Sequence, residues 1–397
     1  SGVRTRGVLG KSLLVVQIAM CAALLVASSA FVLSLTKLRG QQAGYQEEHL
    51  VIADTQFPRS FGEERRDELI ETLRARASAL PGVTAAAFSN TGQLSGRGIE
   101  MRIGFPNGDK ADSSKTLIME QGISPGFLVA VGTPLVSGRE FTDADDERAA
   151  LVTIVNESFT HRFLVGREPI GERFYREGGS RSGELMEIVG VVRDSKWLNL
   201  RDESPAMYYR PYKQMGGTPV VRMAIRTSGD PDLLARELPS IAQSIDKGFS
   251  LTNVVPFSEI VDRSLVIERL VAQVSSAFGG LALLIASVGL YGALAYSVAR
   301  RRREIGLRIA IGAGGGSIER MFLKESLMLL AIGAAIGIPA GIAVTRLASY
   351  LLFGIGPADP AGVAITLSAL TITTMAATYL PARSAAAIDP ILVLKDE

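Results

Sequence analysis

Cysteine and histidine are nearly absent from this chain. Its 397 residues contain one cysteine, Cys21, and two histidines, His49 and His161. A disulfide within the chain is therefore excluded. A zinc site is not expected, because such sites gather several His or Cys ligands at short spacings. Cys21 lies in an apolar run, where we expect a buried small residue, and the large central region must be held by its hydrophobic core alone.

Catalytic motifs are absent as well. The chain has no G-x-S-x-G sequence, and Gly312–Ser317 lacks the lysine that a phosphate-binding loop requires. The acidic loop Asp143–Glu147 could hold calcium, but it lacks the glycine and the bidentate glutamate of an EF-hand, which favours a solvated turn. We therefore predict that the chain is not an enzyme and has no cofactor and no metal site. Any ATP hydrolysis would fall to a separate chain.

Long apolar runs are abundant, and charges are missing from their centres. Four runs have the length of roughly 20 residues that a membrane span needs, at residues 13–36, 270–299, 326–347 and 361–382. The alternative, core helices of a large soluble protein, is disfavoured by their number. Intramembrane charges mark ion and proton pathways, so their absence disfavours a proton-coupled carrier.

Most of the basic residues that flank these runs lie on one side. Lys11 precedes the first run, Arg300–Arg303 follow the second and Arg383 follows the fourth, whereas residues 350–360 carry Asp359 and no Lys or Arg. Lys and Arg in short loops mark the cytoplasmic side, so both termini are predicted to be cytoplasmic. The basic excess suits a membrane rather than nucleic acid. The predicted order is a cytoplasmic tail (1–12), a first span (13–36), an outer domain (37–269), a second span (270–299), a cytoplasmic loop (300–325), two further spans (326–347 and 361–382) and a cytoplasmic tail (383–397).

The outer domain has the alternating pattern of an α+β fold. One β-α-β unit is predicted from a strand at 50–57, a helix at 63–80 and a strand at 83–89. A second is predicted from a strand at 220–227, a helix at 232–246 and a strand at 250–256. We expect an inserted α/β subdomain at about 91–212 between them, with Asn156 or Ser158 capping a helix. The fold class is thus an α+β domain on a four-helix transmembrane domain.

The basic segment Arg300–Ser317 contains a helix that is apolar on two sides. Glu304 and Arg308 have the i,i+4 spacing of a helical ion pair. Ile305 and Ile309 form one apolar pair, and Leu307 and Ile311 form another on a different face. A helix with two apolar faces needs two partners, which would be the membrane bundle and a cytoplasmic protein. A solvated anchor that only ends a span remains the alternative.

Three glycines lie four residues apart in the third span, at Gly333, Gly337 and Gly341. Aligned small residues allow another helix to approach closely. The stripe is therefore interpreted as helix packing within the bundle, with a dimer seam or sliding face as the alternative.

Three groups of residues together resemble a known family. They are Arg303–Ala313 (R-E-I-G-L-R-I-A-I-G-A), Tyr379–Arg383 (Y-L-P-A-R) and, in the outer domain, Ile123–Phe127 (I-S-P-G-F) with Ile154–Glu157 (I-V-N-E). The chain resembles the FtsX-like/MacB-type permeases of the ABC superfamily. The resemblance implies a bacterial inner-membrane protein with a periplasmic core domain between its first and second spans. It also implies that a cytoplasmic ABC ATPase contacts Arg303, Glu304, Ile305, Gly306, Leu307, Arg308 and Ile309.

The start of the chain departs from MacB itself, in which an ATPase domain precedes the first span. In this sequence, residues 1–12 precede the first predicted span. The start of the sequence is similar to the second half of duplicated orphan permeases. We therefore expect a separate permease subunit or part of a longer tandem chain, working with a second permease copy or tandem half. The resemblance implies that ATP-driven motion crosses the membrane to export or extract a substrate. The alternative is a scaffold that regulates a periplasmic enzyme such as a cell-wall hydrolase.

Overall fold

The computed structural model of the chain divides into two compact units. Residues 1–41 and 266–397 form the first, which we call the bundle, and residues 42–265 form the second, which we call the body. The structure describes residues 2–41, 43–92, 94, 98–106, 118–177, 183–216, 221–311 and 315–386.

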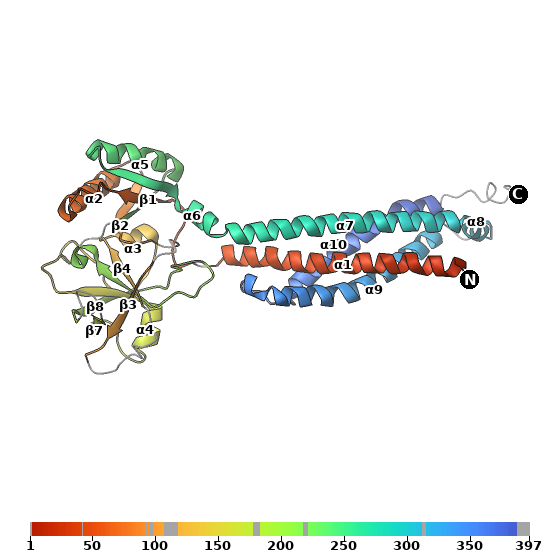
Figure 1. Cartoon of the computed structure of the whole chain (residues 1–397), viewed down its shortest axis with the longest axis horizontal. Helices are drawn as coiled ribbons and strands as arrows, with labels where there is room; N and C mark the ends of the chain where they lie inside the picture. The colour runs from red at the N-terminus through yellow and green to blue at the C-terminus, as the bar shows by residue number, and fades with distance from the viewer. Residues whose placement is uncertain are drawn as a thin grey trace. The chain divides into compact units, whose positions relative to one another are not determined.

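The bundle consists of long helices that lie side by side (Figure 1). Its helices are α1 (Gly2–Arg39), α7 (Val266–Arg300), α8 (Arg302–Ala310), α9 (Gly315–Leu347), the short η2 (Ser349–Leu351) and α10 (Pro360–Ala386). Helix α1 contacts α7, α9 and α10. By length and composition, α1, α7, α9 and α10 could each cross a membrane.

The segment at 300–325, predicted to be a cytoplasmic loop that contains a helix, is mostly helical. Helix α7 continues to Arg300, α8 follows almost at once, and α9 begins at Gly315, well before the apolar run. The helix predicted within this segment is present as α8, and α9 extends beyond the apolar run that predicted it. Arg, Lys and Glu are good helix formers, so backbone hydrogen bonding continues beyond the apolar residues. Residues 312–314 lie outside the described part of the chain.

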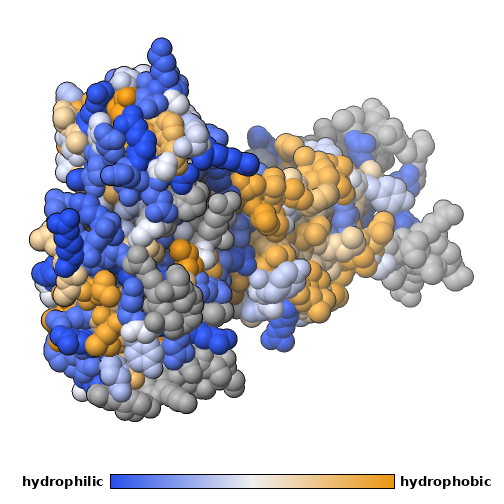
Figure 2. All heavy atoms as spheres, turned by 60° about the vertical axis from the view of Figure 1, so that its left-hand side comes forward, coloured by the Kyte–Doolittle hydropathy of each residue, from blue (hydrophilic) through white to orange (hydrophobic). Residues whose placement is uncertain are grey.

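The face of the bundle seen in the space-filling view is largely apolar (Figure 2). Large side chains such as Phe278, Leu284 and Val288 on α7 are exposed. Its interior is apolar too, with Ile18 and Cys21 of α1 packed in one cluster. Helices that are apolar on all sides are typical of membrane spans.

One lobe of the body is a four-stranded antiparallel sheet with helices on one face. Its strands are β1 (Leu50–Gln56), β2 (Val83–Ser89), β10 (Arg222–Thr227) and β11 (Ser250–Pro256), in the order β11-β1-β10-β2. The helices are α2 (Glu63–Ser78) and α5 (Pro231–Ile245). The mixed α/β content agrees with the sequence prediction. The pairing does not follow the two units, because β10 lies between β1 and β2 and the units interleave.

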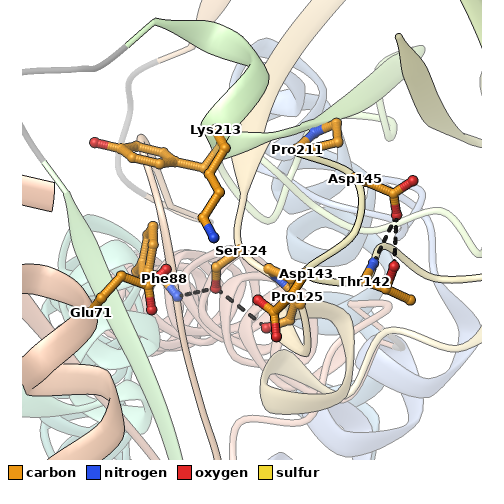
Figure 3. Close-up of a pocket in the computed structure, with 10 residues that line it drawn as sticks. Glu71, Phe88, Ser124, Pro125, Thr142, Asp143, Asp145, Pro211 and Lys213 are labelled. Atoms are coloured by element: carbon orange, nitrogen blue, oxygen red, sulfur yellow. Dashed lines mark hydrogen bonds between the residues drawn. The ribbon is translucent and has the colours of Figure 1, made fainter. Parts of the chain in front are cut away.

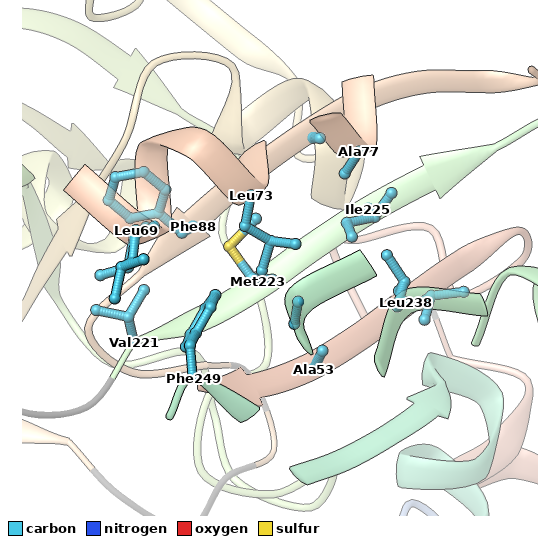
Figure 4. Packing of buried hydrophobic residues seen from close by; sticks show 14 of the residues in the cluster. Ala53, Leu69, Leu73, Ala77, Phe88, Val221, Met223, Ile225, Leu238 and Phe249 are labelled. Carbon is cyan, nitrogen blue, oxygen red and sulfur yellow. The ribbon is translucent and has the colours of Figure 1, made fainter. Parts of the chain in front are cut away.

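Both helices supply side chains to one core with this sheet (Figure 4). Leu69 and Leu73 of α2 and Leu238 of α5 pack against Met223 and Ile225 of β10. Burying a side chain of this size contributes about 1.5–3 kcal/mol. The spacing of these apolar residues on α2, an otherwise charged helix, therefore fixes which of its faces meets the sheet.

The second lobe is a closed barrel. Its strands are β3 (Ile99–Gly104), β4 (Ile118–Ile123), β6 (Val152–Asn156), β7 (Arg173–Glu177), β8 (Leu185–Val192) and β9 (Met207–Pro211). They pair in the order β4-β3-β7-β8-β6-β9, and β9 returns to β4, while β5 (Leu135–Gly138) pairs with β8. Phe159, Phe174 and Tyr208 pack inside. Closure protects strand edges that would otherwise be open to pairing.

Short helices complete the body: α3 (Phe127–Val131), α4 (Glu157–Phe163), η1 (Tyr212–Met215) and α6 (Phe257–Ser264). Asn156 caps α4, since its side chain accepts a hydrogen bond from the backbone N–H of Phe159 at 3.0 Å. This confirms one of the two caps predicted. Ser158 instead donates through its hydroxyl to Asp194 at 2.6 Å.

Candidate functional site

Helix α8 is fixed to the bundle by one face. Ile305 is 1% exposed and packs with Leu290 and Leu294 of α7 and Phe322 of α9, and Ile309 lies at the edge of the same cluster. Arg308 donates to Glu304 at 2.7 Å, which confirms the predicted i,i+4 ion pair. The apolar spacing of Ile305 and Ile309 thus anchors a helix whose remaining residues are mostly charged.

The opposite face of α8 carries exposed apolar side chains. Leu307 is 52% exposed, and Ile311, directly after the helix, is 79% exposed. Of the seven residues predicted to contact a partner, Arg303, Glu304, Leu307 and Arg308 are exposed, Ile309 is half-buried, and Ile305 and Gly306 are buried. The accessible part of the predicted contact therefore centres on Leu307.

An ionic cluster that was not predicted lies at this end of the bundle. Glu325 of α9 accepts from Lys11 of α1 at 2.6 Å and from Arg301, between α7 and α8, at 3.4 Å. Glu325 is partly buried, so both contacts are partly shielded from water. The cluster joins α1 and α9 to the turn between α7 and α8. In the sequence, its only signal is an acidic residue placed just before a long apolar run.

The glycine stripe of α9 faces α1. A Cβ atom on Gly337 would lie 2.2 Å from the carbonyl oxygen of Ala19, and one on Gly333 would lie 2.5 Å from Ile18. A Cβ on Gly341 would meet the backbone of Ala23 at 2.9 Å. The three glycines therefore permit an approach between α1 and α9 that no larger residue would allow.

Two polar contacts tie α1 to α7. The side-chain amide of Gln17 donates to the carbonyl oxygen of Ile285 at 2.8 Å, and the hydroxyls of Ser28 and Ser276 lie 3.3 Å apart. Polar side chains that bond across helices are typical of membrane bundles. Helix α1, which leads into the body, is thus held to α7, which leads out of it.

In the acidic loop of the body, Asp145 pairs with a nearby arginine. Arg139 donates to both carboxylate oxygens of Asp145 at 2.8 and 2.9 Å, and the backbone N–H of Thr142 donates at 2.8 Å. The hydrogen bonds from Arg139 lower the pKa of Asp145 below its usual value. Figure 3 shows this loop beside a hollow that Ser124 and Lys213 also line. Among the described residues, no group of three or more His, Cys, Asp or Glu could hold a metal ion.

Two family models match the chain. The MacB-like periplasmic core domain matches residues 12–245, and the FtsX-like permease C-terminal region matches residues 276–390. The first covers more than half of the chain.

Known proteins are similar over much of its length. The uncharacterized ABC transporter permease YknZ of Bacillus subtilis is 26% identical over 282 residues, which are 70% of this chain and 69% of YknZ. The macrolide export ATP-binding/permease protein MacB of Marinobacter nauticus is 24% identical over 68% of this chain, but the match spans only 42% of that protein. The crystal structure of the periplasmic region of MacB from Actinobacillus actinomycetemcomitans aligns with 58% of this chain and 97% of its own, at 15% identity and a TM-score of 0.39. This chain belongs to the family of FtsX-like permeases that carry a MacB-like periplasmic core domain.

Proposed function

We propose that this permease receives force from a cytoplasmic ABC ATPase at the outward face of α8 and passes it to its periplasmic body. The observation that carries the proposal is the exposure of Leu307 and Ile311 on a helix whose other face is buried. Exposing two large aliphatic side chains to water is unfavourable, and a partner that covers them gains about 1.5–3 kcal/mol for each one fully buried. The arginines around them suit a partner surface that carries carboxylates.

The orientation in the membrane rests on charge. Lys11, Arg301 and Glu325 bring the start of α1, the end of α7 and the start of α9 to one end of the bundle. Arg302, Arg303 and Arg308 of α8 follow directly after α7. Because Lys and Arg accumulate on the cytoplasmic side, this end is proposed to be cytoplasmic, together with both termini.

Helices α1 and α7 are the proposed transmitters. Helix α7 has 35 residues, which at about 1.5 Å per residue give a rod of roughly 52 Å, longer than the hydrocarbon core of about 30 Å. In sequence it follows α6 of the body directly and ends directly before α8. A push on α8 would therefore reach the body through α7, with only Arg301 and Leu265 outside helices along this path. A second permease copy or a tandem half is the proposed neighbour in the membrane.

The proposed output is export or extraction from the periplasmic side. It is supported by the name of the Marinobacter relative, a macrolide export protein.

The test is a single charge on the outward face of α8. Leu307→Glu would place an unpaired carboxylate in a desolvated interface, which typically costs about 2–5 kcal/mol. We expect normal membrane insertion together with loss of the ATPase in co-purification from detergent. Leu233→Glu on α5 of the body, where Leu233 is 57% exposed, is the matched control and should leave the association intact.

Retention of the ATPase by Leu307→Glu would contradict the docking proposal. The exposed face of α8 would then lie against water or lipid headgroups, and a scaffold for a periplasmic enzyme would become the better interpretation.

A further inference from the structure

The segment Ala43–His49, which we call the strap, crosses the body between α1 and β1. It has no regular secondary structure, yet its backbone is bonded along its length. The carbonyl oxygen of Ala43 accepts from the backbone N–H of Lys196 at 2.8 Å, and that of Gly44 accepts from the Thr133 hydroxyl at 3.1 Å. The strap is therefore bound first to the segment that follows β8 and to the turn that precedes β5.

Arg226 of β10 holds the middle of the strap. Its Nη2 donates to the carbonyl oxygen of Gln46 at 2.8 Å, and its Nη1 donates to that of Glu48 at 2.9 Å. Its Nε donates to the carbonyl oxygen of Ala130 on α3 at 2.8 Å. All three nitrogens of one guanidinium thus serve backbone carbonyls, two of them on the strap. A flexible lysine with one ammonium group could not reproduce this fork.

Gly44 brings the strap against the barrel lobe without an intervening side chain. Its φ is +79°, and a Cβ atom there would lie 2.0 Å from the carbonyl oxygen of Asp194. Only glycine adopts this conformation readily and fits this space. The next residue, Tyr45, packs edge-on against Phe257 with ring centroids 5.0 Å apart. Phe257 is the first residue of α6, the helix that precedes α7 in sequence.

We infer that Arg226 is a positioning residue that fixes the strap, which follows α1 in sequence, to both lobes of the body. This inference rests on the proposed function. A free linker of this length behaves as a flexible coil whose ends move independently, so it would absorb a displacement of α1. A strap bonded to β10, to α3 and to the barrel lobe passes that displacement on. Its contact with Phe257 links the entry of the chain into the body to its exit.

The test uses the full chain with its partner ATPase in lipid nanodiscs, in a Cys21→Ala background. Spin labels at Val165 of the barrel lobe and Leu233 of α5, which are 78% and 57% exposed, report the distance between the lobes. We expect ATP to change this distance in the parent chain and to leave it unchanged in Arg226→Met and Arg226→Lys. ATP hydrolysis should be the same in all three, because the strap lies far along the chain from α8.

Arg222→Met is the matched control. Arg222 lies on the same strand but pairs with Asp54 at 2.6 Å and makes none of the strap contacts described here. It should retain the ATP-dependent distance change. Hydrogen exchange adds a readout that does not depend on ATP. The backbone N–H of Gln46, which donates to the carbonyl oxygen of Val131 at 2.9 Å, should exchange faster in the Arg226 variants and at the parent rate in Arg222→Met.

The outcomes separate the two claims. A distance change that persists in both Arg226 variants overturns the role of the strap and leaves the proposed function standing. The absence of any ATP-dependent change in the parent chain, with the ATPase bound, overturns the proposed function and the coupling role of the strap together.

Discussion

The interiors of the bundle and the barrel lobe are packed with different kinds of residue. In the bundle, α1 and α9 meet where α9 has no side chain, so that a Cβ on Gly337 would lie 2.2 Å from the Ala19 carbonyl. In the barrel lobe, charged side chains fill one layer: Glu120 and Arg210, each with a side chain 1% exposed, are 3.2 Å apart. Arg176 approaches Glu120 at 3.6 Å, and Glu184 approaches Arg210 at 3.4 Å.

The difference follows from the two solvents. Within lipid, apolar side chains gain little by leaving their surroundings, so association depends on close contact and interhelical hydrogen bonds. In water, burial of the phenylalanine cluster drives folding of the barrel and can offset the desolvation of four charges. The bundle should therefore be sensitive to added volume, and the barrel should be sensitive to lost charge.

Each region contains its own natural reporter. Trp197, the only tryptophan of the chain, is 1% exposed in the body, and Cys21, the only cysteine, is 1% exposed in the bundle. Tryptophan fluorescence therefore follows unfolding of the body. Reaction of the thiol with a fluorogenic maleimide during heating follows opening of the bundle.

The largest expected effect is on the charged layer. Glu120→Gln leaves Arg210 without its buried carboxylate partner and should lower the free energy of unfolding of the body by about 3 kcal/mol. The measurement is urea unfolding followed by Trp197 fluorescence. The double variant Glu120→Met/Arg210→Met should lose less than the single one, since Arg176 and Glu184 still balance in charge. If the double variant loses more free energy of unfolding than the single variant, the Glu120–Arg210 pair itself stabilises the fold.

The next effect concerns the glycine contact. Gly337→Leu should lower the temperature at which Cys21 becomes reactive, because overpacking typically costs about 1–3 kcal/mol. Gly280→Leu on α7, where a Cβ would meet nothing within 4 Å, is the control and should react like the parent chain. Equal reactivity of the two variants would mean that α1 and α9 are not packed tightly.

The smallest effect is that of pH on the acidic loop. Hydrogen bonds from Arg139 lower the pKa of Asp145, so the unfolded chain binds a proton more readily than the folded one as the pH falls. The stabilisation is complete above the unfolded pKa of about 3.9 and is lost as the pH falls through the lower folded value. Arg139→Gln should lower the free energy of unfolding of the body at pH 7. The difference in this free energy between the variant and the parent chain should become smaller below about pH 4. A difference that grows in acid would contradict this pairing.

Several elements could be predicted from sequence, because their signals are local. Strands β2 and β11 lie at the predicted residues, and the cap at Asn156 follows from its position before α4. Strands β3, β4 and β7 were not predicted. In β4, for example, Glu120 and Gln121 stand among apolar residues, and their burial depends on strands distant in sequence. The interleaved sheet is likewise a product of long-range pairing, which hydropathy does not encode.

The candidate site could be predicted in part for the same reason. The two faces of α8 follow from the spacing of Ile305, Leu307 and Ile309. In any helix this spacing alone decides which side chains share a face. Which face meets the bundle could not be predicted, because it depends on Leu290, Leu294 and Phe322 from other helices. Arg226 gave no signal at all, since its three acceptors are backbone carbonyls with no mark in the sequence.

The two faces of α8 have separate proposed roles, and one paired comparison of variants distinguishes them. Ile305→Ala and Leu307→Ala would be compared for the temperature of Cys21 labelling and for retention of the ATPase. We predict that Ile305→Ala, which opens a cavity in the buried cluster, lowers the labelling temperature, and that Leu307→Ala leaves it unchanged while weakening retention. Identical behaviour of the two variants in both assays would contradict these separate roles.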